Sequence, residues 1–325
     1  GKCEPLPGEQ SVRVPSLHGT PVDQVPELSL AQVTREVLRG IEQRYDLVVA
    51  NFANGDVLGH TQNSEAKIEC AARVDARLGE VVDAALANDM VIMVTADHGN
   101  LEEMIHPDGS PHVSHTANLV PFIVIDPRGR PGAVRDGRLA DVAPTVLDAL
   151  GLGRPTAMSG KSLAPDADWG GCRRVVLLIL DGWGIGKNDA TNPIWLAPTP
   201  AWDELIHSRP LARLEAAGEA VGLRMGKPGN SEAGHMNIGA GRIVLQDDAR
   251  IDRALADGSF ARNEILCDAI GEAARRNSGL HLIGLLSEKS SHGTIDYPLA
   301  LLRLAAAHGL HQVYLHLIFD GRSTE

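Results

Sequence analysis

Basic residues, cysteines and long apolar runs are scarce in this sequence. Lys and Arg number 30 against 42 Asp and Glu, and the resulting net charge of -12 disfavours nonspecific binding to nucleic acid or anionic membranes. The four cysteines, Cys3, Cys70, Cys172 and Cys267, form no CxxC pair, so neither a zinc ribbon nor a disulfide framework is predicted. No apolar run is long enough to span a bilayer, and no signal-peptide pattern stands at the start. We therefore expect a soluble, cytoplasmic protein without nucleic-acid or membrane partners.

Apolar runs rich in Val and Ile alternate with longer amphipathic stretches. This pattern is typical of a mostly parallel sheet covered by helices, and 325 residues suffice for one large α/β domain or for two domains. Strands are predicted at 45–52, 90–98, 118–126, 173–182 and 311–321. Helices are predicted at 64–87, with Ser64 as the N-cap, and at 299–310, closed by Gly309.

Polar side chains follow the predicted strands at the points where the strands end. They are Asn54, Asp56, Asp97, His98, Asp181 and Asp320. Because ligands bind at the carboxyl ends of strands in open α/β sheets, one sheet would bring these residues to a shared edge.

Three Asp and three His residues form a candidate metal-ligand set. Asp56 and His60 are four residues apart, Asp97 and His98 are adjacent, and His115 and Asp181 stand in loops. Taken singly, Asp181 fits a turn or helix cap, and His60 or His115 fits a structural role. Together they indicate metal binding, because that many carboxylates beside apolar strands are costly unless ions neutralise them. Mixed imidazole and carboxylate ligands suit Mn, Fe, Co or Zn, and a pair of such ions commonly supports phosphoryl transfer.

The stretch "PGNSEAGHMNIGAGR" at 228–242 supplies a candidate nucleophile. Its Gly, Asn and Ser content also fits plain turn chemistry. A serine hydroxyl becomes a useful nucleophile when a metal or a base activates it. Ser231 could coordinate one ion and attack phosphorus, while Gly229 and Gly234 would let the backbone approach a bulky anion.

Five motifs resemble the cofactor-independent phosphoglycerate mutases, which are members of the alkaline phosphatase superfamily. The motifs are "LILDGWGIG" at 178–186, "GNSEAGHMNIGAGR" at 229–242, "NFANGDVLGHT" at 51–61, "VTADHGNLEEM" at 94–104 and "SHTANLVPFIV" at 114–124. The resemblance implies an alkaline-phosphatase-like α/β fold with a mostly parallel sheet flanked by helices, and a second, incomplete α/β domain. It also implies glycolytic isomerase activity.

The resemblance implies a role for each matching residue. Ser231 would be the phosphoserine nucleophile. Two divalent ions, Mn²⁺ with Zn²⁺, Co²⁺ or Mg²⁺ as alternatives, would be held in two sets: Asp56, His60 and His115 in one, Asp97, His98, Asp181 and Ser231 in the other.

Substrate contacts are implied for His292 and Arg322. Around His292 the sequence departs from the family pattern at Glu288, Lys289, Gly293 and Thr294, and Ser323 replaces the family's Asp after Arg322. In the family that Asp acts in proton transfer on the glycerate hydroxyls.

The order of the motifs is reversed relative to the family. "LDGWG" follows "TADHGN" here, which implies a circular permutation with its join near 166–172. The segment that in the family lies between "DGRSTE" and "GKCEPLPGE" has no match in this sequence. We predict a permuted, metal-binding catalytic domain at 1–250 and a partial substrate-binding domain at 251–325.

The leading interpretation is a metal-dependent mutase that interconverts 3-phosphoglycerate and 2-phosphoglycerate through a phosphoserine. Its partner is a small phosphorylated carboxylate, and we expect a monomer. One alternative is a phosphohydrolase, or a mutase that acts on a related phospho- or phosphono-carboxylate. Another is a noncatalytic, metal-bound scaffold.

Overall fold

The computed structural model describes residues 5–17, 19–129, 132–287 and 294–319. Within them the chain forms two compact units, Gly1–Val244 and Leu245–Glu325. Unit 1 is built on a six-stranded sheet, and unit 2 on a two-stranded sheet. None of the described helices has the length and apolar character needed to cross a membrane.

The sheet of unit 1 has the strand order β1-β5-β2-β3-β6-β4. The strands are β1 Leu47–Phe52, β2 Val91–Thr95, β3 Val120–Ile125, β4 Gly137–Arg138, β5 Val175–Leu180 and β6 Leu211–Glu215. Strand β3 pairs antiparallel with both of its neighbours, while β1 with β5, β5 with β2, and β4 with β6 pair in parallel. Five strands therefore point in one direction, which confirms the predicted mostly parallel sheet.

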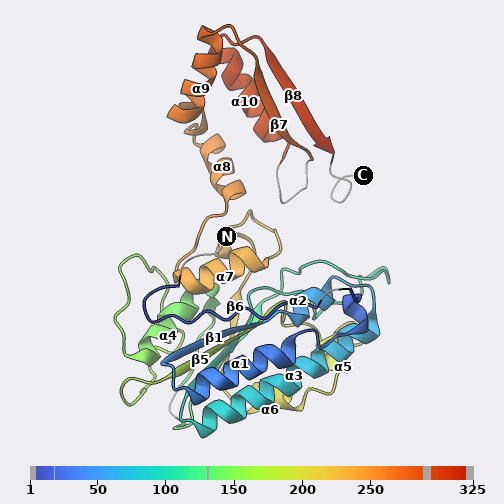
Figure 1. Cartoon of the computed structure of the whole chain (residues 1–325), viewed down its shortest axis with the longest axis vertical. Helices are drawn as coiled ribbons and strands as arrows, with labels where there is room; N and C mark the ends of the chain where they lie inside the picture. The colour runs from blue at the N-terminus through green and yellow to red at the C-terminus, as the bar shows by residue number, and fades with distance from the viewer. Residues whose placement is uncertain (1–4, 18, 130–131, 288–293, 320–325) are drawn as a thin grey trace. The chain divides into compact units, whose positions relative to one another are not determined.

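Helices flank this sheet on both faces. Helices α1, α3 and α6 lie on one face, and α4 and α7 lie on the other (Figure 1). The helices of unit 1 are α1 Leu30–Glu42, α2 Asn54–Gly59, α3 Ser64–Ala87, α4 Val142–Leu150, α5 Pro193–Leu196, α6 Pro200–Ser208 and α7 Ser231–Ala240. Short 3-10 turns span Val22–Gln24, Leu139–Asp141 and Gly218–Val221.

The core of unit 1 follows from the continuous apolar runs of its central strands. Every residue of β2, β3 and β5 is buried, as expected for strands covered on both faces. Strand β1 lies at the edge of the sheet, and there Leu47 and Val49 remain partly exposed.

The N-cap of helix α3 lies one residue earlier than predicted. The N-cap is Asn63, whose side-chain oxygen accepts a hydrogen bond from the Ala66 amide at 3.1 Å. Ser64 is the first helical residue instead. Asn and Ser are both strong N-cap residues, so the sequence favoured neither over the other.

Unit 2 contains α8 Asp247–Ala256, a 3-10 turn at Phe260–Arg262, α9 Glu264–Arg275, β7 Leu280–Leu286, α10 Asp296–Ala307 and β8 Val313–Phe319. Strands β7 and β8 pair in parallel, with α10 in the connection between them. Helix α10 ends as predicted before Gly309, which has a φ of +72°. Strand β8 belongs to this separate sheet, so the expectation that one sheet carries all the polar strand ends is wrong for β8. Asp320, the polar residue predicted to follow this strand, lies outside the described residues.

Candidate metal centre

The direction of each strand explains why the predicted ligands meet. Asp181 follows β5 directly, and Asp97 and His98 follow β2 at the same edge of the sheet. Asp56 lies in α2, just after the end of β1. Strand β3 runs in the opposite direction, so the loop that enters it, and not the one that leaves it, carries His115 to this edge. Three connections of unit 1 thus converge: the one after β1, the one after β5, and the one between β2 and β3, which contributes both of its ends.

One group of ligand atoms forms around the Asp56 carboxylate. Asp56 Oδ1 lies 3.0 Å from His115 Nε2 and 3.3 Å from His60 Nε2, and the two ring nitrogens are 3.0 Å apart. The carboxylate also accepts a hydrogen bond from the Asn100 side chain at 3.0 Å. The structure therefore brings together Asp56, His60 and His115.

A second group forms beside the first around His98, which is fully buried. His98 Nε2 lies 3.4 Å from Asp181 Oδ1 and 3.5 Å from Asp97 Oδ2. It also lies 3.7 Å from Asp56 Oδ1, so His98 stands between the two groups. Asp97, His98 and Asp181 offer ligand atoms that all lie within 4.8 Å of one another, and so do Asp56, His98 and His115.

Ser231 stands at the start of α7 and faces the second group. Its hydroxyl lies 3.1 Å from His98 Nε2 and donates to Asp181 Oδ1 at 3.3 Å. Asn230 caps the helix by accepting a hydrogen bond from the Ala233 amide. A Cβ on Gly234 would overlap the backbone of Asp97. That glycine therefore serves the close approach of α7 to the loop after β2.

The orientation of the three histidines tests whether a cation fits the site. His60 Nδ1 lies 2.9 Å from the Val113 carbonyl, His115 Nδ1 lies 2.8 Å from the Gly229 carbonyl, and His98 Nδ1 lies 3.1 Å from the Gly99 carbonyl. When each Nδ1–H donates to its carbonyl, each Nε2 presents a lone pair to the centre of the site. In that tautomer two lone pairs and a carboxylate oxygen converge with no proton between them, as a cation requires. Without metal, protons on the same ring nitrogens make the hydrogen bonds to Asp56.

A buried carboxylate oxygen also indicates that a cation fits the site. Asp97 Oδ2 is buried and accepts no hydrogen bond within the described part of the chain. His235 Nδ1 lies 3.0 Å away, but its hydrogen-bond partner is the Ser231 carbonyl at 2.9 Å. Unsatisfied buried acceptors are costly, and a cation would satisfy this one. The side chains present therefore fit divalent metal ions.

Proximity of opposite charges shifts the pKa values of the site. Burial favours the neutral form of His98, but the carboxylates of Asp181, Asp97 and Asp56 outweigh it and raise the pKa of His98 to about 9. Burial likewise opposes ionisation of Asp56, yet hydrogen bonds from His115, His60 and Asn100 hold its pKa well below the usual range. Burial raises the pKa of Asp181. Without metal, His98 therefore carries a proton at neutral pH.

Three residues join the site that the sequence did not single out. Asn51 donates its side-chain amide to Asp181 Oδ2 at 2.8 Å, Asn100 contacts Asp56, and His235 contacts Asp97. All three lie inside or beside the motifs quoted above, and His235 follows Ser231 by one helical turn. By contrast, buried Asn54 donates to the carbonyls of Pro26 and Glu27 and has a structural role.

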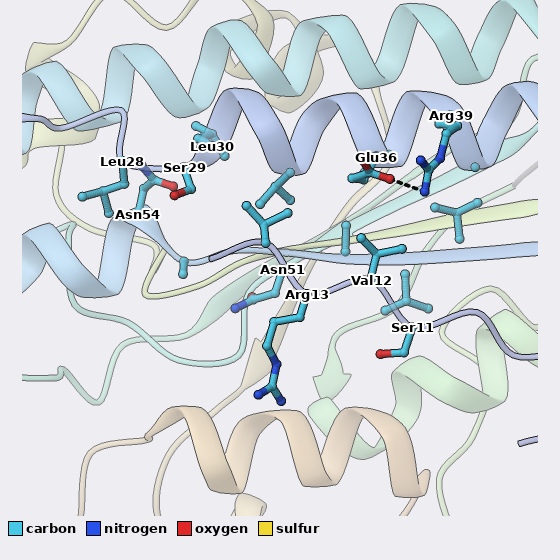
Figure 2. A pocket seen from close by; sticks show the side chains of 18 of the residues that line it. Ser11, Val12, Arg13, Leu28, Ser29, Leu30, Glu36, Arg39, Asn51 and Asn54 are labelled. Atoms are coloured by element: carbon cyan, nitrogen blue, oxygen red, sulfur yellow. Dashed lines mark ion pairs between the residues drawn. The ribbon is translucent and has the colours of Figure 1, made fainter. Parts of the chain in front are cut away.

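A cavity of about 1050 Å³ opens beside the metal centre. Residues of the segment 10–17, of α1 and of β1 line it, mostly with apolar side chains. Asn51 and His235 also line it, so two residues in contact with the centre border the cavity. Figure 2 shows Arg13 extending away from Val12, on the same side of the chain as Asn51.

The predicted substrate contacts His292 and Arg322 lie outside the described residues, as do Glu288, Lys289, Gly293 and Ser323. Thr294 is described and buried, and its hydroxyl donates to Asp296 Oδ2 at 3.3 Å.

Comparison with known proteins first shows which families parts of the chain resemble. Residues 1–154 match the Metalloenzyme superfamily, and residues 251–325 match the BPG-independent PGAM N-terminus. The particular resemblance is to 2,3-bisphosphoglycerate-independent phosphoglycerate mutases. The protein of that name from Moorella thermoacetica is 48% identical over 163 residues, covering 50% of this chain and 32% of the relative. The one from Idiomarina loihiensis is 46% identical over 150 residues, covering 46% of this chain and 29% of the relative.

These matches confirm the resemblance predicted from the motifs. The chain spans about a third of the length of the curated relatives that it matches. A crystal structure of Leishmania mexicana phosphoglycerate mutase at low cobalt concentration aligns with 46% of this chain and 30% of its own, at 30% identity and a TM-score of 0.39.

Proposed function

We propose that this chain carries out metal-dependent phosphoryl transfer of the phosphoglycerate mutase type, interconverting 3-phosphoglycerate and 2-phosphoglycerate through phospho-Ser231. One observation carries the proposal: the Ser231 hydroxyl, at the start of a helix, lies 3.1 Å from His98 Nε2 and 3.3 Å from Asp181 Oδ1. A metal-poised serine at a helix N-terminus is suited to attack phosphorus, because the helix end favours the anionic phosphoryl group. The names of the matching relatives support the same reaction.

The metal ligands divide into two sets. Asp56, His60 and His115 would hold one ion, and Asp97, His98, Asp181 and Ser231 the other. Mixed nitrogen and oxygen donors favour Mn²⁺, Co²⁺ or Zn²⁺ over Mg²⁺, and we propose two Mn²⁺ ions. When bound, such ions lower the pKa of the serine hydroxyl and neutralise charge on the phosphoryl oxygens.

The chain's own groups account for the movement of the proton. As Ser231 Oγ forms its bond to phosphorus, the bond between phosphorus and the ester oxygen breaks, and that oxygen leaves as a glycerate hydroxyl by taking up the proton that Ser231 has passed to Asp181. The hydroxyl proton points to Asp181 Oδ1, and burial makes that carboxyl more basic. Asn51 donates to Asp181 Oδ2, so Oδ1 stays turned toward the serine. Retransfer to the other hydroxyl of glycerate would regenerate Ser231.

The cavity beside the centre supports a small phosphorylated carboxylate as the substrate. Arg13 lines it together with Asn51 and His235, and an arginine holds a carboxylate through two parallel hydrogen bonds. With the phosphoryl group at the metal centre, the carboxylate would lie toward Arg13. His292 and Arg322 remain proposed contacts from unit 2, which we interpret as part of a substrate-binding domain in a permuted chain.

A phosphorus NMR time course with Mn²⁺ and 3-phosphoglycerate tests the proposal. We expect 2-phosphoglycerate to appear, and we expect Ser231→Ala to lower the rate by about 10³-fold or more, as loss of an essential nucleophile does. Ser259→Ala, in unit 2 and far from any described ligand in sequence, is the control and should retain full activity. Unchanged turnover in Ser231→Ala would refute the phosphoserine route.

Arg13→Gln tests the orientation of the substrate. We expect the KM for a phosphorylated carboxylate to rise about tenfold, the value of one charge-assisted interaction, and the KM for phenyl phosphate to stay within twofold. Equal changes for both substrates would remove Arg13 from the carboxylate site.

Phosphohydrolase activity is the second candidate. The residues of both ligand sets and the cavity belong to unit 1, so water could attack phospho-Ser231 unless the substrate is shielded. In the same NMR experiment this activity would release inorganic phosphate without any 2-phosphoglycerate.

We also propose a cytoplasmic monomer that does not bind nucleic acid. The net charge of -12 supports the last point, because like charges repel a polyanion. Light scattering and a gel-shift measurement at low salt would test the two properties.

A further inference from the structure

A buried carboxylate beneath the metal centre has no part in the two ligand sets. Glu102, in the motif "VTADHGNLEEM", is fully buried, and its two oxygens accept four hydrogen bonds from neutral donors. Oε2 accepts the backbone amides of Asn100 at 2.8 Å and Gly184 at 3.0 Å. Oε1 accepts the Thr116 hydroxyl and, at 2.9 Å, the Asn118 side-chain amide.

The donors come from two connections, and each carries predicted ligands. Asn100, Thr116 and Asn118 lie in the connection between β2 and β3, to which Glu102 itself belongs, and Gly184 lies in the connection after β5. Asn100 follows His98 by two residues in the loop after β2. Gly184 follows Asp181 by three residues in the loop after β5. Thr116 is the neighbour of His115 in the loop before β3. A single side chain therefore joins the two ends of the β2–β3 connection to each other and to the connection after β5.

Glycines make room for this carboxylate. A Cβ at Gly184 would overlap the Glu102 carboxyl group, and a Cβ at Gly99 would overlap both Glu102 and the Thr116 hydroxyl. The loops therefore pack directly onto the carboxylate, with no space to shift toward it. Hydrogen bonds to a buried charge are strong, and leaving any of them unmade is costly. Glu102 consequently adds to the backbone hydrogen bonds that join these segments, from Thr116 to the Gly99 carbonyl at 2.9 Å and from Asn100 to the Gly182 carbonyl at 3.1 Å.

We propose that Glu102 is a positioning residue that holds the two ends of the β2–β3 connection and the segment after β5 at the separation that their ligands require. The inference rests on the metal centre of the proposed function. Groups that orient metal ligands change metal affinity by about 10- to 100-fold when they are replaced. Glu102 would act through the loop backbones, in addition to the carbonyls that orient each histidine ring.

The test compares Glu102→Gln with Glu103→Gln in the full chain. A glutamine keeps the size of the side chain, but its amide nitrogen cannot accept hydrogen bonds, so one pair of donors loses its acceptor. Glu103 is a matched control because it accepts from the same Asn118 amide at 2.9 Å but, within the described part of the chain, from neither Thr116 nor Gly184. By calorimetric titration with Mn²⁺, we expect about 10- to 100-fold weaker binding for Glu102→Gln and less than a twofold change for Glu103→Gln.

Thr116→Val separates the contributions of the loops. It removes the hydroxyl bond to Glu102 from the residue next to His115 and leaves the bonds from Asn118, Asn100 and Gly184. We expect weaker binding at the set formed by Asp56, His60 and His115, and less than a threefold change at the other set. This variant also keeps the test decisive if Glu102→Gln does not fold.

A purely structural role for Glu102 gives a different pattern. Glu102→Gln would then unfold at a lower temperature without metal, while the folded variant would bind Mn²⁺ with unchanged affinity. That result would overturn the positioning role and leave the metal centre intact. Failure of the unaltered chain to bind Mn²⁺ would overturn the metal centre itself, and this inference with it.

Discussion

The two units of the molecule differ in how much of their apolar surface they bury. In unit 1, three whole strands are buried, together with Trp183, Phe52 and many aliphatic side chains. The buried cluster of unit 2 consists of Ile270, Leu304, Ala305 and Leu310. On its two strands, Ile283, Tyr314, Ile318 and Phe319 are each more than half exposed. Because burial of apolar surface is the main stabilising term, unit 1 has the larger margin of stability.

The two units also differ in which of them carries the candidate metal ligands. All of the described candidate ligands lie in unit 1, on loops that its rigid sheet positions. Precise metal geometry needs a scaffold that holds each side chain, which the well-packed core supplies.

Matched core substitutions provide the strongest test of whether the two units differ in stability and unfold separately. Leu178→Ala in β5 and Leu304→Ala in α10 each remove a buried side chain, which costs about 2–5 kcal/mol. All four tryptophans, Trp169, Trp183, Trp195 and Trp202, lie in unit 1, so tryptophan fluorescence reports its unfolding and circular dichroism reports both units. We expect Leu178→Ala to shift the fluorescence transition and Leu304→Ala to shift only a transition seen by dichroism. A shift of fluorescence in Leu304→Ala would show that the units unfold together.

Metal should stabilise the two units unequally. Mn²⁺ at 100 times its Kd is expected to raise the free energy of unfolding of unit 1 by about 2.7 kcal/mol for each ion bound, because it binds the folded state alone. Unit 2 should be unaffected. Denaturant titrations with Mn²⁺ and with a chelator, followed by fluorescence and dichroism, measure both effects, and equal stabilisation of the two units would contradict the assignment.

The pH dependence of metal binding tests whether His98 is a metal ligand with a raised pKa. Burial and the surrounding carboxylates leave His98 with a pKa of about 9, so below that pH a proton occupies the nitrogen that a metal needs. The apparent affinity for Mn²⁺ should therefore increase with pH, by about tenfold or 1.4 kcal/mol per unit between pH 6 and 8. Calorimetry in buffers of different ionisation enthalpy would detect about one released proton. A pH-independent affinity would contradict the assigned pKa.

Two asparagine caps offer the smallest and most closely matched comparison. Asn63 accepts from the Ala66 amide at the start of α3, and Asn263 accepts from the Leu266 amide at the start of α9, both at 3.1 Å. Replacing either with alanine should cost about 1 kcal/mol. Asn63→Ala should shift the fluorescence transition, and Asn263→Ala the dichroism transition of unit 2. Loss of more than about 2 kcal/mol in either variant would indicate a role beyond capping.

Continuous apolar runs made the buried strands predictable from the sequence, while alternating strands escaped notice. Strands β2, β3 and β5 are unbroken apolar runs. Strand β6, Leu211–Glu215, alternates exposed and buried residues and includes Arg213 and Glu215, so it resembles a polar loop in sequence. Strand β7 interrupts its apolar run with His281 and Gly284. Their pairing with neighbouring strands, and not their composition, makes them strands.

The ligand types were predictable because Asp and His beside apolar strands are unusual. The supporting residues were not, since their roles depend on which loops meet. Nothing in the spacing of Glu102 and Thr116, fourteen residues apart, indicates that they share a hydrogen bond. The antiparallel direction of β3 brings His115 to the site, and the apolar sequence of the strand does not predict this direction.

The direction of β5 has a practical consequence for labelling. Asp181 follows the carboxyl end of this strand, and Cys172 precedes its amino end, at the opposite edge of the sheet. The Cys172 thiol is exposed and free, whereas Cys70 is buried and burial raises the pKa of its thiol. A maleimide dye would therefore react with Cys172 in preference to Cys70. Cys267 is free and half-buried, and Cys3 lies outside the described residues, so both would be replaced by serine before labelling. The protein thus provides an attachment point for a fluorescent reporter that leaves the metal ligands untouched.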